Sequence, residues 1–203
     1  MCNNKKQSRI NTKECIFHII QIIIMTFLIG GSCNINQFLK RKQADPKLNK
    51  VTLERLLWSI AFPGFGQLLN HKYLKSLLFI LMEMVINNQS NFNLAIISSF
   101  NGNIDKATEY INFQWLMFYP CLYFFAMWDA VRDTNEEGEA PLYSFLPYLS
   151  CAIFVTIGLI YSQKWNLFGV LVGPIFMPIL CVIPGAAVGL AIKNWLLKNS
   201  SNP

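Results

Sequence analysis

Apolar residues in this chain gather in long runs, and short polar segments separate the runs. Four runs predict helices, at residues 74–88, 114–130, 143–162 and 167–192. The last two are long enough to cross a hydrocarbon core of about 30 Å as α-helices. The first two are slightly short, so interfacial Trp, Asn and charged residues would have to flank them. The pattern therefore predicts an all-α, integral membrane helical bundle with about four full spans.

A shorter apolar stretch, residues 56–70, runs directly into the first long run. Three residues interrupt it: Pro63, Gly64 and Gly66. Proline removes a helix N–H donor and glycine permits positive φ, so the chain should bend there. Backbone groups freed at membrane depth need other partners, and Gln67 and Asn70 are the nearest polar side chains that could supply them. We expect residues 56–70 to enter the membrane and return to the same side as a bent, re-entrant hairpin.

The distribution of basic residues sets the expected orientation. The chain carries 17 Lys and Arg and a net charge of +6. If the four runs cross and residues 56–70 return, only Lys106 and Lys164 lie outside, which fits the excess of basic residues in short cytoplasmic loops. If residues 15–32 and 56–69 both crossed instead, the asymmetry would nearly vanish. We therefore expect a multi-pass protein of the plasma membrane with both termini cytoplasmic, and a basic rim that faces anionic lipid and requires no nucleic acid.

Residues 1–45 form a basic and apolar segment ahead of the polytopic domain at residues 46–199. The apolar stretch 15–32 follows four basic residues and precedes Cys33, in the outline of a signal peptide. Cys33 lies where a bacterial lipoprotein carries its lipid. Three interpretations remain open for this segment: signal or lipoprotein processing, an additional uncleaved span, and an interfacial or re-entrant helix.

The residue types that most enzymes use for catalysis are sparse. The six cysteines are scattered and form no CxxC pair, and the only histidines are His18 and His71. A zinc site or a nucleophilic triad would have few ligands or bases to recruit. The sequence therefore predicts no enzyme, no catalytic or metal-binding residues, and no cofactor.

Two acidic residues in or beside the predicted spans have a functional and a structural interpretation. Glu83 interrupts an apolar run, and an intramembrane carboxylate is a candidate for ion coupling. It also lies about one helical turn from Asn87, so it could instead reach the interface or pair with another helix. Asp129 follows Trp128 at a predicted span end, where a charge at the membrane boundary is the expected interpretation.

The last run combines Pro178 and Pro184 with small residues spaced four apart, including Gly185 and Gly189. Prolines predict kinks, and the glycines predict a smooth face for close helix packing. A discontinuous helix is also how many transporters build a midplane site, and the break at residues 63–66 would supply a second one. Packing is the preferred interpretation, because the two breaks share no visible repeat.

The residues from Pro63 to Lys75 resemble the hairpin of TM2-domain small membrane proteins. The shared elements are Pro63, Gly64, Gly66, Gln67, Asn70 and Lys75. The likeness covers about residues 56–80, and it departs at His71 and Ser76, where such proteins commonly carry glycine. The remainder, notably residues 115–133, looks like uncharacterised polytopic membrane proteins of low-GC Gram-positive bacteria. The resemblance implies a membrane address, a bacterial plasma membrane, without implying a reaction.

These observations lead to two functional hypotheses from different classes. The first is an assembly, accessory or interaction factor whose partners are the lipid bilayer and another membrane protein or a second copy of itself. The alternative is a small transporter or transporter subunit that uses Glu83 and the broken helices. A membrane enzyme ranks third.

Overall fold

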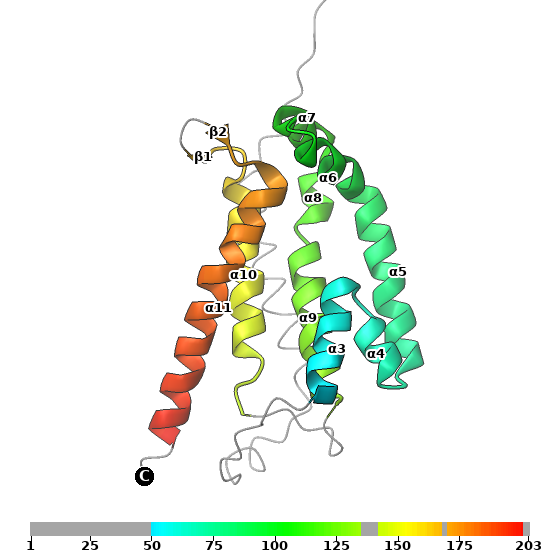
Figure 1. Cartoon of the computed structure of the whole chain (residues 1–203), viewed down its shortest axis with the longest axis vertical. Helices are drawn as coiled ribbons and strands as arrows, with labels where there is room; N and C mark the ends of the chain where they lie inside the picture. The colour runs from blue at the N-terminus through cyan, green and yellow to red at the C-terminus, as the bar shows by residue number, and fades with distance from the viewer. Residues whose placement is uncertain (1–49, 135–141, 168–169, 201–203) are drawn as a thin grey trace, which may run out of the picture. The chain divides into compact units, whose positions relative to one another are not determined.

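The computed structural model describes residues 50–134, 142–167 and 170–200 (Figure 1). Contacts divide the chain into the units Met1–Ser32 and Cys33–Pro203, and every described residue belongs to the second unit. The expectations for residues 1–45, including Cys33, lie outside the described residues. In chain order the elements are α3 Lys50–Ala61, α4 Phe65–Leu69, α5 Tyr73–Ser90, α6 Phe92–Phe100, α7 Ile104–Tyr110, α8 Phe113–Leu116, α9 Tyr119–Arg132, α10 Leu146–Tyr161, β1 Asn166–Leu167, β2 Val170–Leu171 and α11 Gly173–Ser200. The described part is thus all-helical apart from one antiparallel pair of two-residue strands.

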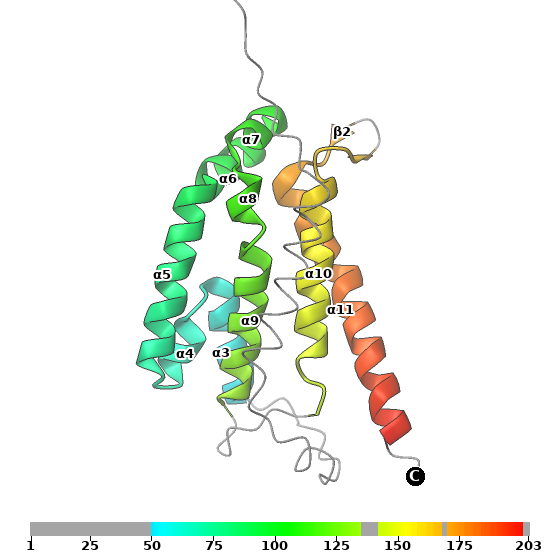
Figure 2. The same ribbon diagram turned by 180° about the vertical axis from the view of Figure 1, so that it is seen from behind.

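The helices of the second unit run up and down between two ends (Figures 1 and 2). Helices α5, α10 and α11, and α8 followed by α9, connect these ends. Helix α3 rises only part of the way, and α4 returns beside it to the end from which α3 started. Helices α6 and α7 and the strand pair lie at the opposite end. The predicted bent hairpin is therefore present as α3 and α4, packed against α5 and α9.

Helix α9 lies at the centre of two apolar clusters. Phe124 and Met127 pack against Cys151, Ala152 and Val155 of α10. The other face of α9 contributes a second cluster with α5, made of Phe79, Ile86, Leu122 and Ala126. Because both clusters share α9, that helix fixes α5 and α10 relative to the hairpin.

Helices α10 and α11 form the most extensive helix pair, and glycines allow their backbones to approach closely. A Cβ atom at Gly185 would lie 2.9 Å from the Cα of Cys151, and one at Gly189 would lie 2.5 Å from the Cα of Pro147. Facing them, a Cβ at Gly158 would lie 3.1 Å from the Cα of Pro178. Gly185 and Gly189 are therefore packing residues of this contact.

Helix boundaries differ from the predicted runs in three places. The run 167–192 was predicted as one helix, but its first residues belong to the strand pair, and α11 begins only at Gly173, where φ is 81°. The run 114–130 is divided between α8 and α9, and Pro120 occupies the first turn of α9, where its missing N–H is not needed. Helix α10 begins at Leu146, just after Tyr143 with its φ of 58°.

Helix α11 is long and apolar enough to cross a membrane, and α10 is a shorter apolar helix. Within the most apolar 18-residue stretch of α11, only 28% of the residues are buried, whereas the core helix of a soluble protein would be mostly buried. Side chains such as Ile179 and Ile183 are 57% and 71% exposed. Length, composition and exposure of α11 thus agree with a lipid-facing helix.

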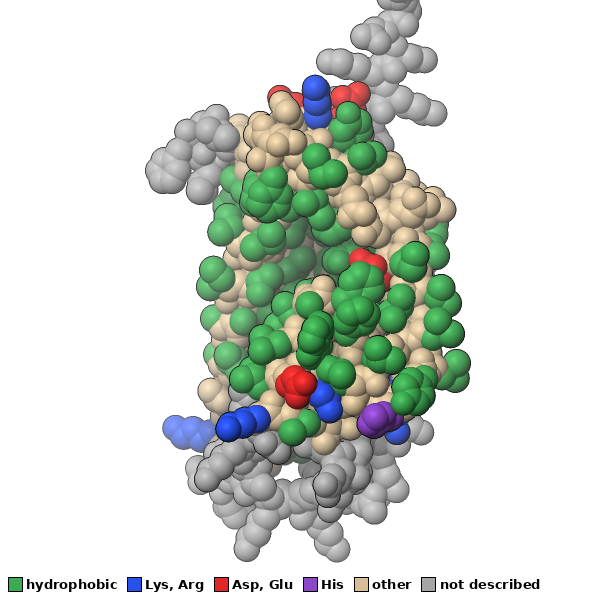
Figure 3. All heavy atoms as spheres, turned by 45° about the vertical axis from the view of Figure 1, so that its right-hand side comes forward, with side chains coloured by type: hydrophobic (Ala, Val, Ile, Leu, Met, Phe, Trp, Pro, Cys, Tyr) green, Lys and Arg blue, Asp and Glu red, His purple; other side chains and the backbone are tan. Residues whose placement is uncertain are grey.

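The polarity of α5 is reversed relative to a helix on the surface of a soluble protein. Its buried positions recur at helical spacing and include three polar residues: Ser76, Glu83 and Ser90. From Leu74 to Val85 its exposed positions are apolar: Leu74, Leu77, Leu78, Leu81, Met82, Met84 and Val85. Figure 3 shows the result, a wide apolar band with charged side chains gathered mainly at the two ends.

Candidate functional site

The bend between α3 and α4 is built by the residues that the sequence singled out. Gly64 has a φ of 103°, and an added Cβ would lie 2.9 Å from the carbonyl oxygen of Ser76. Pro63 is fully buried. Backbone bonds close the turn, from Phe62 N to Trp58 O at 3.0 Å and from Phe65 N to Phe62 O at 3.2 Å. Only glycine combines this left-handed φ with so close an approach to α5.

Gly66 marks the point at which α3, α4 and α9 come closest. An added Cβ would lie 2.6 Å from the Cβ of Ala130 and 2.9 Å from the carbonyl oxygen of Arg55, and it would also clash with the Ser59 hydroxyl. A side chain of any size would therefore push α4 away from α9. This close approach brings the next polar residues of α4 within reach of the α9 backbone.

Gln67 and Asn70 bind successive turns of α9. The Gln67 side chain is fully buried, and its Nε2 donates to the carbonyl oxygen of Ala126 at 2.8 Å. Asn70 Nδ2 donates to the carbonyl oxygen of Ala130 at 2.8 Å. Gln67 lies in α4 and Asn70 directly after it, and the carbonyls that accept from them are one helical turn apart on α9. Gln67 and Asn70 were predicted to serve the backbone groups freed at the bend, but their amide groups donate to carbonyl oxygens of α9 instead.

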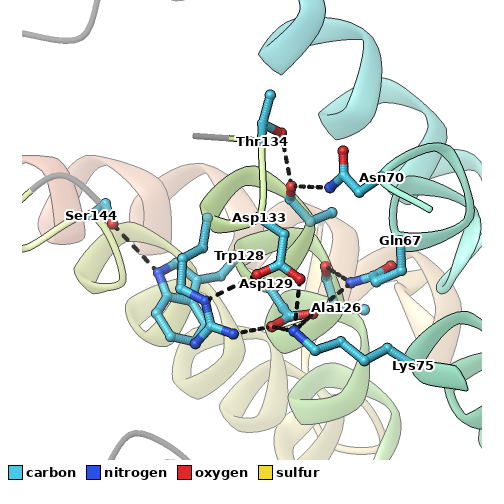
Figure 4. A network of polar contacts seen from close by, with 11 residues as sticks. Gln67, Asn70, Lys75, Ala126, Trp128, Asp129, Asp133, Thr134 and Ser144 are labelled. Carbon is cyan, nitrogen blue, oxygen red and sulfur yellow. Dashed lines mark hydrogen bonds and ion pairs between the residues drawn. The ribbon is translucent and has the colours of Figure 1, made fainter. Parts of the chain in front are cut away.

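Asp129 is the central acceptor of this polar cluster (Figure 4). Its side chain is 3% exposed. Oδ1 accepts from Lys75 Nζ at 3.0 Å and from Arg132 Nη2 at 2.7 Å, and Oδ2 accepts from Gln67 Nε2 at 3.2 Å. Helices α4, α5 and α9 therefore all contribute to one carboxylate. Asp129 was expected to be a charge at the membrane boundary, and the structure adds that its carboxylate, in the last turn of α9, is buried and paired with cations.

A second carboxylate balances the cations. Asp133 Oδ2 accepts from Lys75 Nζ at 2.7 Å, and its Oδ1 lies 3.5 Å from Arg132 Nε. The Arg132 guanidinium also lies 4.8 Å from the centre of the Trp128 ring, in a cation–π contact. Two cations thus face two carboxylates, and the cluster is electrically neutral. Both carboxylates form ion pairs with cations. This arrangement favours a structural role in holding the helices together over a role in acid–base chemistry.

The cluster extends to α3 and to the segment before α10. Arg55 Nε donates to Asn70 Oδ1 at 3.1 Å, which ties the start of the hairpin to its end. Trp128 Nε1 donates to Ser144 Oγ at 3.4 Å, and Thr134 Oγ1 donates to the carbonyl oxygen of Ala130 at 2.9 Å. Figure 4 shows Asn70, Ser144 and Thr134 beside the last turns of α9. We call residues Gln67, Asn70, Lys75, Asp129, Arg132 and Asp133 the hairpin clasp.

At the top of the bent hairpin, a tyrosine satisfies the backbone of α3. The Tyr123 hydroxyl of α9 donates to the carbonyl oxygen of Ile60. That carbonyl belongs to the last turn of α3, where helix carbonyls have no intrahelical partner. In a hydrocarbon environment such a group must be satisfied inside the protein. The Tyr123 hydroxyl therefore supplies the hydrogen bond that a water molecule would donate to this carbonyl at the end of an exposed helix.

Glu83 is buried apart from the clasp. It is 5% exposed and lies eight residues beyond Lys75, about 12 Å along α5 by helix rise. The polar side chains that interact with its carboxylate are Asn87, one turn further along α5, and Tyr119 of α9. Glu83 thus lies on the protein-facing side of α5.

Of the residues that the sequence singled out, Gln67, Asn70 and Asp129 lie in the clasp, and Pro63, Gly64 and Gly66 form the bend and the close helix contact beside it. Gly185 and Gly189 lie in the separate contact of α10 with α11. Asp133, Arg132 and Tyr123 were not predicted from the sequence as members of the site. Their signal was present in part, because Asp129, Arg132 and Asp133 share one helix end with Trp128.

Two buried polar atoms near the bend, Gln67 Oε1 and Ser59 Oγ, have no hydrogen-bond partner. Within the described ranges, no group of three or more His, Cys, Asp or Glu residues is placed to hold a metal ion. The chain matches no protein-family model, no curated protein and no solved structure.

Proposed function

We propose that this chain is a multi-pass helical protein of the plasma membrane that acts as an assembly or interaction factor. The location in a membrane is supported by the distribution of side chains, in which polar residues are buried between the helices and apolar residues are exposed. Gln67, Asp129 and Thr156 are at most 2% exposed, while large apolar side chains such as Leu77 and Ile183 are more than half exposed. Such a surface is unfavourable in water over so wide an area and favourable in lipid.

In this proposal four helical segments cross the membrane. Helix α5 has 18 residues, and α11 has 28, which correspond to about 27 Å and 42 Å by helix rise. Residues 113–132, which hold α8 and α9, and the 16 residues of α10 provide the other two spans, with lengths of about 30 Å and 24 Å. Helices α3 and α4 enter from one side and return to it. The clasp supports this topology by closing the open end of the bent hairpin.

Charge supports an orientation with the clasp facing the cytoplasm. Most of the described basic residues lie at that end of the helices: Lys50, Arg55, Lys72, Lys75, Arg132, Lys193 and Lys198. Lys106 and Lys164 lie at the other end. Cytoplasmic loops carry the excess of Lys and Arg, so α6 and α7 face outward.

The hairpin also supports kinship with TM2-domain proteins as a proposal. The helix end at Asn70 closes with two backbone bonds, from Lys72 N to Gln67 O at 2.9 Å and from His71 N to Leu68 O at 3.0 Å. This is the Schellman arrangement, which favours glycine at the position that His71 occupies with a φ of 58°. Proteins of the resembled type commonly have glycine there.

The outward-facing cap supports the interaction role. On α6, Leu94, Ile97 and Phe100 are 51%, 59% and 69% exposed, on a helix that carries no charged residue. Helix α7 beside it carries Asp105, Lys106 and Glu109. An apolar strip bordered by charges at the membrane surface suits contact with lipid headgroups or with another membrane protein.

Cysteine labelling tests the topology. A membrane-impermeant maleimide added to intact cells should label Lys106→Cys on α7, and should label Lys72→Cys and Asn199→Cys only after permeabilisation. All three positions are exposed. Labelling of the parent protein measures the background from the six native cysteines. Labelling of Lys72→Cys in intact cells would show that the clasp faces outward and would refute the orientation.

Cross-linking in the native membrane through a C-terminal affinity tag, followed by mass spectrometry, tests the role. A specific membrane-protein partner, lost when Ile97 and Phe100 are both changed to serine, would support an interaction factor. Capture of the same proteins by the double variant and the parent would refute the assignment of that role to the α6 surface. A transport role would instead require Glu83.

A further inference from the structure

We propose that Glu83, Asn87 and Tyr119 form a binding site for one monovalent cation, a proton or Na⁺, at the buried face of α5. The proposal rests on the multi-pass topology above and does not depend on the assembly role. Its basis is a comparison between two buried carboxylates in the same helix bundle, which differ in how their charge is compensated.

Asp129 is a buried carboxylate whose negative charge is balanced by cations of the protein itself. Two cations, Lys75 and Arg132, lie 3.0 Å and 2.7 Å from its Oδ1. Glu83 is about as buried, at 5% exposure, yet no Lys, Arg or His of the described segments forms an ion pair with it. Burying an uncompensated carboxylate in a membrane costs several kcal/mol. A bound cation would remove that cost.

Among the described helices that pack closely against α5, the only Lys, Arg or His is Arg132 of α9, which Asp129 and Asp133 engage. Helices α4, α6 and α8 pack against α5, and none of the three contains a titratable side chain. From α9, Tyr119 interacts with the Glu83 carboxylate, and Tyr123 stacks on Tyr119. On α5 itself, Lys75 is engaged by Asp129 and Asp133. Neither Lys75 nor Arg132 therefore forms an ion pair with the Glu83 carboxylate.

The groups at this position are oxygen atoms of the kind that bind hard cations. They are the Glu83 carboxylate and the Tyr119 hydroxyl, and Asn87, one turn further along α5, adds a side-chain oxygen that is buried without a hydrogen-bond partner. Oxygen ligands suit H⁺ and Na⁺ and do not favour the softer transition metals. One carboxylate neutralises one positive charge, so the fitting ligand is monovalent.

The site is connected to the bent hairpin. The Tyr119 ring stacks on the Tyr123 ring, with centroids 5.7 Å apart and an interplanar angle of 24°. The Tyr123 hydroxyl then donates to the carbonyl oxygen of Ile60 at the end of α3. A cation held at Glu83 would therefore fix the tyrosine that satisfies the bend, and occupancy should stabilise the folded protein.

The experiment uses the full-length protein purified in lipid nanodiscs. Thermal unfolding is measured in NaCl and in choline chloride at equal ionic strength, and over a series of pH values, for the wild type, Glu83→Gln and the matched control Glu109→Gln. Glu109 is exposed on α7. Infrared difference spectra of the same three proteins report the protonated carboxyl group.

If the ligand is Na⁺, NaCl should raise the unfolding midpoint of the wild type and of Glu109→Gln by roughly 2–4 °C over choline chloride, and should leave Glu83→Gln unchanged. If the ligand is a proton, a protonated-carboxyl band should appear in the wild type and in Glu109→Gln and be missing from Glu83→Gln. Wild type and Glu83→Gln that respond alike to Na⁺ and show the same band would overturn the proposal.

Asn87→Ala provides a second variant in case Glu83→Gln does not fold. It removes the oxygen ligand, keeps the carboxylate, and changes a residue that is only partly buried. We expect the Na⁺ concentration at half effect to rise about tenfold, or the carboxyl band to shift in frequency. An Asn87→Ala protein that matches the wild type in both readouts would contradict the site. Maleimide labelling of the same variants reports the topology separately, so a failed topology and an absent cation site give different results.

Discussion

Replacing Asp129 by asparagine tests whether the clasp holds the bent hairpin in place. The substitution keeps the size of the side chain, so it opens no cavity, but it removes the negative charge that Lys75 and Arg132 share. The asparagine side chain also has an amide NH₂ group, which would face the N–H donors of Lys75, Arg132 and Gln67. Gln67 keeps its bond to the carbonyl oxygen of Ala126. The expected loss therefore comes from the ion pairs.

The magnitude follows from burial and from the remaining partners. Breaking a fully buried ion pair costs about 3–5 kcal/mol. Here the Lys75 and Arg132 side chains are 40% and 26% exposed, and Asp133 still pairs with both, so solvent and the second carboxylate reduce the loss. We expect Asp129→Asn to lower the free energy of unfolding by about 2–3 kcal/mol, and Asp133→Asn by about 1 kcal/mol.

The assay is reversible unfolding in mixed micelles with increasing SDS, followed by circular dichroism. Glu109→Gln, on the exposed surface of α7, serves as the matched control and should change stability by less than about 0.5 kcal/mol. A double-mutant cycle with Lys75→Met isolates the pair, because Asp129→Asn should cost about 1 kcal/mol less in that background. The reasoning fails if Asp129→Asn costs no more than the control, or if its cost is unchanged by Lys75→Met.

Three further substitutions address the bent hairpin, measured by the same assay. Gly66→Ala should destabilise the protein by about 1–3 kcal/mol, because the new Cβ would lie 2.6 Å from that of Ala130, and an unchanged midpoint would refute the close contact. His71→Gly should raise stability by about 0.5–1 kcal/mol by relieving a left-handed φ of 58°, and a loss of stability would contradict the Schellman turn. Tyr123→Phe should cost about 1–3 kcal/mol by leaving the carbonyl oxygen of Ile60 unpaired, and a neutral effect would show that another group satisfies it.

Local features of the hairpin could be predicted from the sequence because they depend on residues close together in the chain. Pro63 and Gly64 specify a bend wherever they occur, and Gln67 and Asn70 were the nearest groups able to hydrogen-bond beside it. The start of the last helix shows what such local prediction cannot decide. It was predicted at Leu167, but α11 begins at Gly173. An apolar stretch looks the same whether it forms a strand pair or a helical turn, because hydropathy alone does not distinguish them.

The identity of the partners came only from tertiary structure. Gln67 and Asp129 are 62 residues apart, and nothing in the chain between them fixes which helix lies beside α4. Apolar helices present similar faces to each other, so neighbours are selected by detailed packing, such as the space left by Gly66 against Ala130. Asp129 was expected to be a charge at the membrane boundary, and its partners on other helices were not predicted. Folding placed α4 and α5 over it, and brought Lys75 with them.

By itself, then, the sequence determined the helical class, the bend and the uneven distribution of charge, since all three follow from local composition and spacing. Only the tertiary structure decided that Asp129 is paired with cations and that Glu83 is buried without one. The compensation of a buried charge depends on which side chains reach it from other helices. Spacing along one helix carries no information about them.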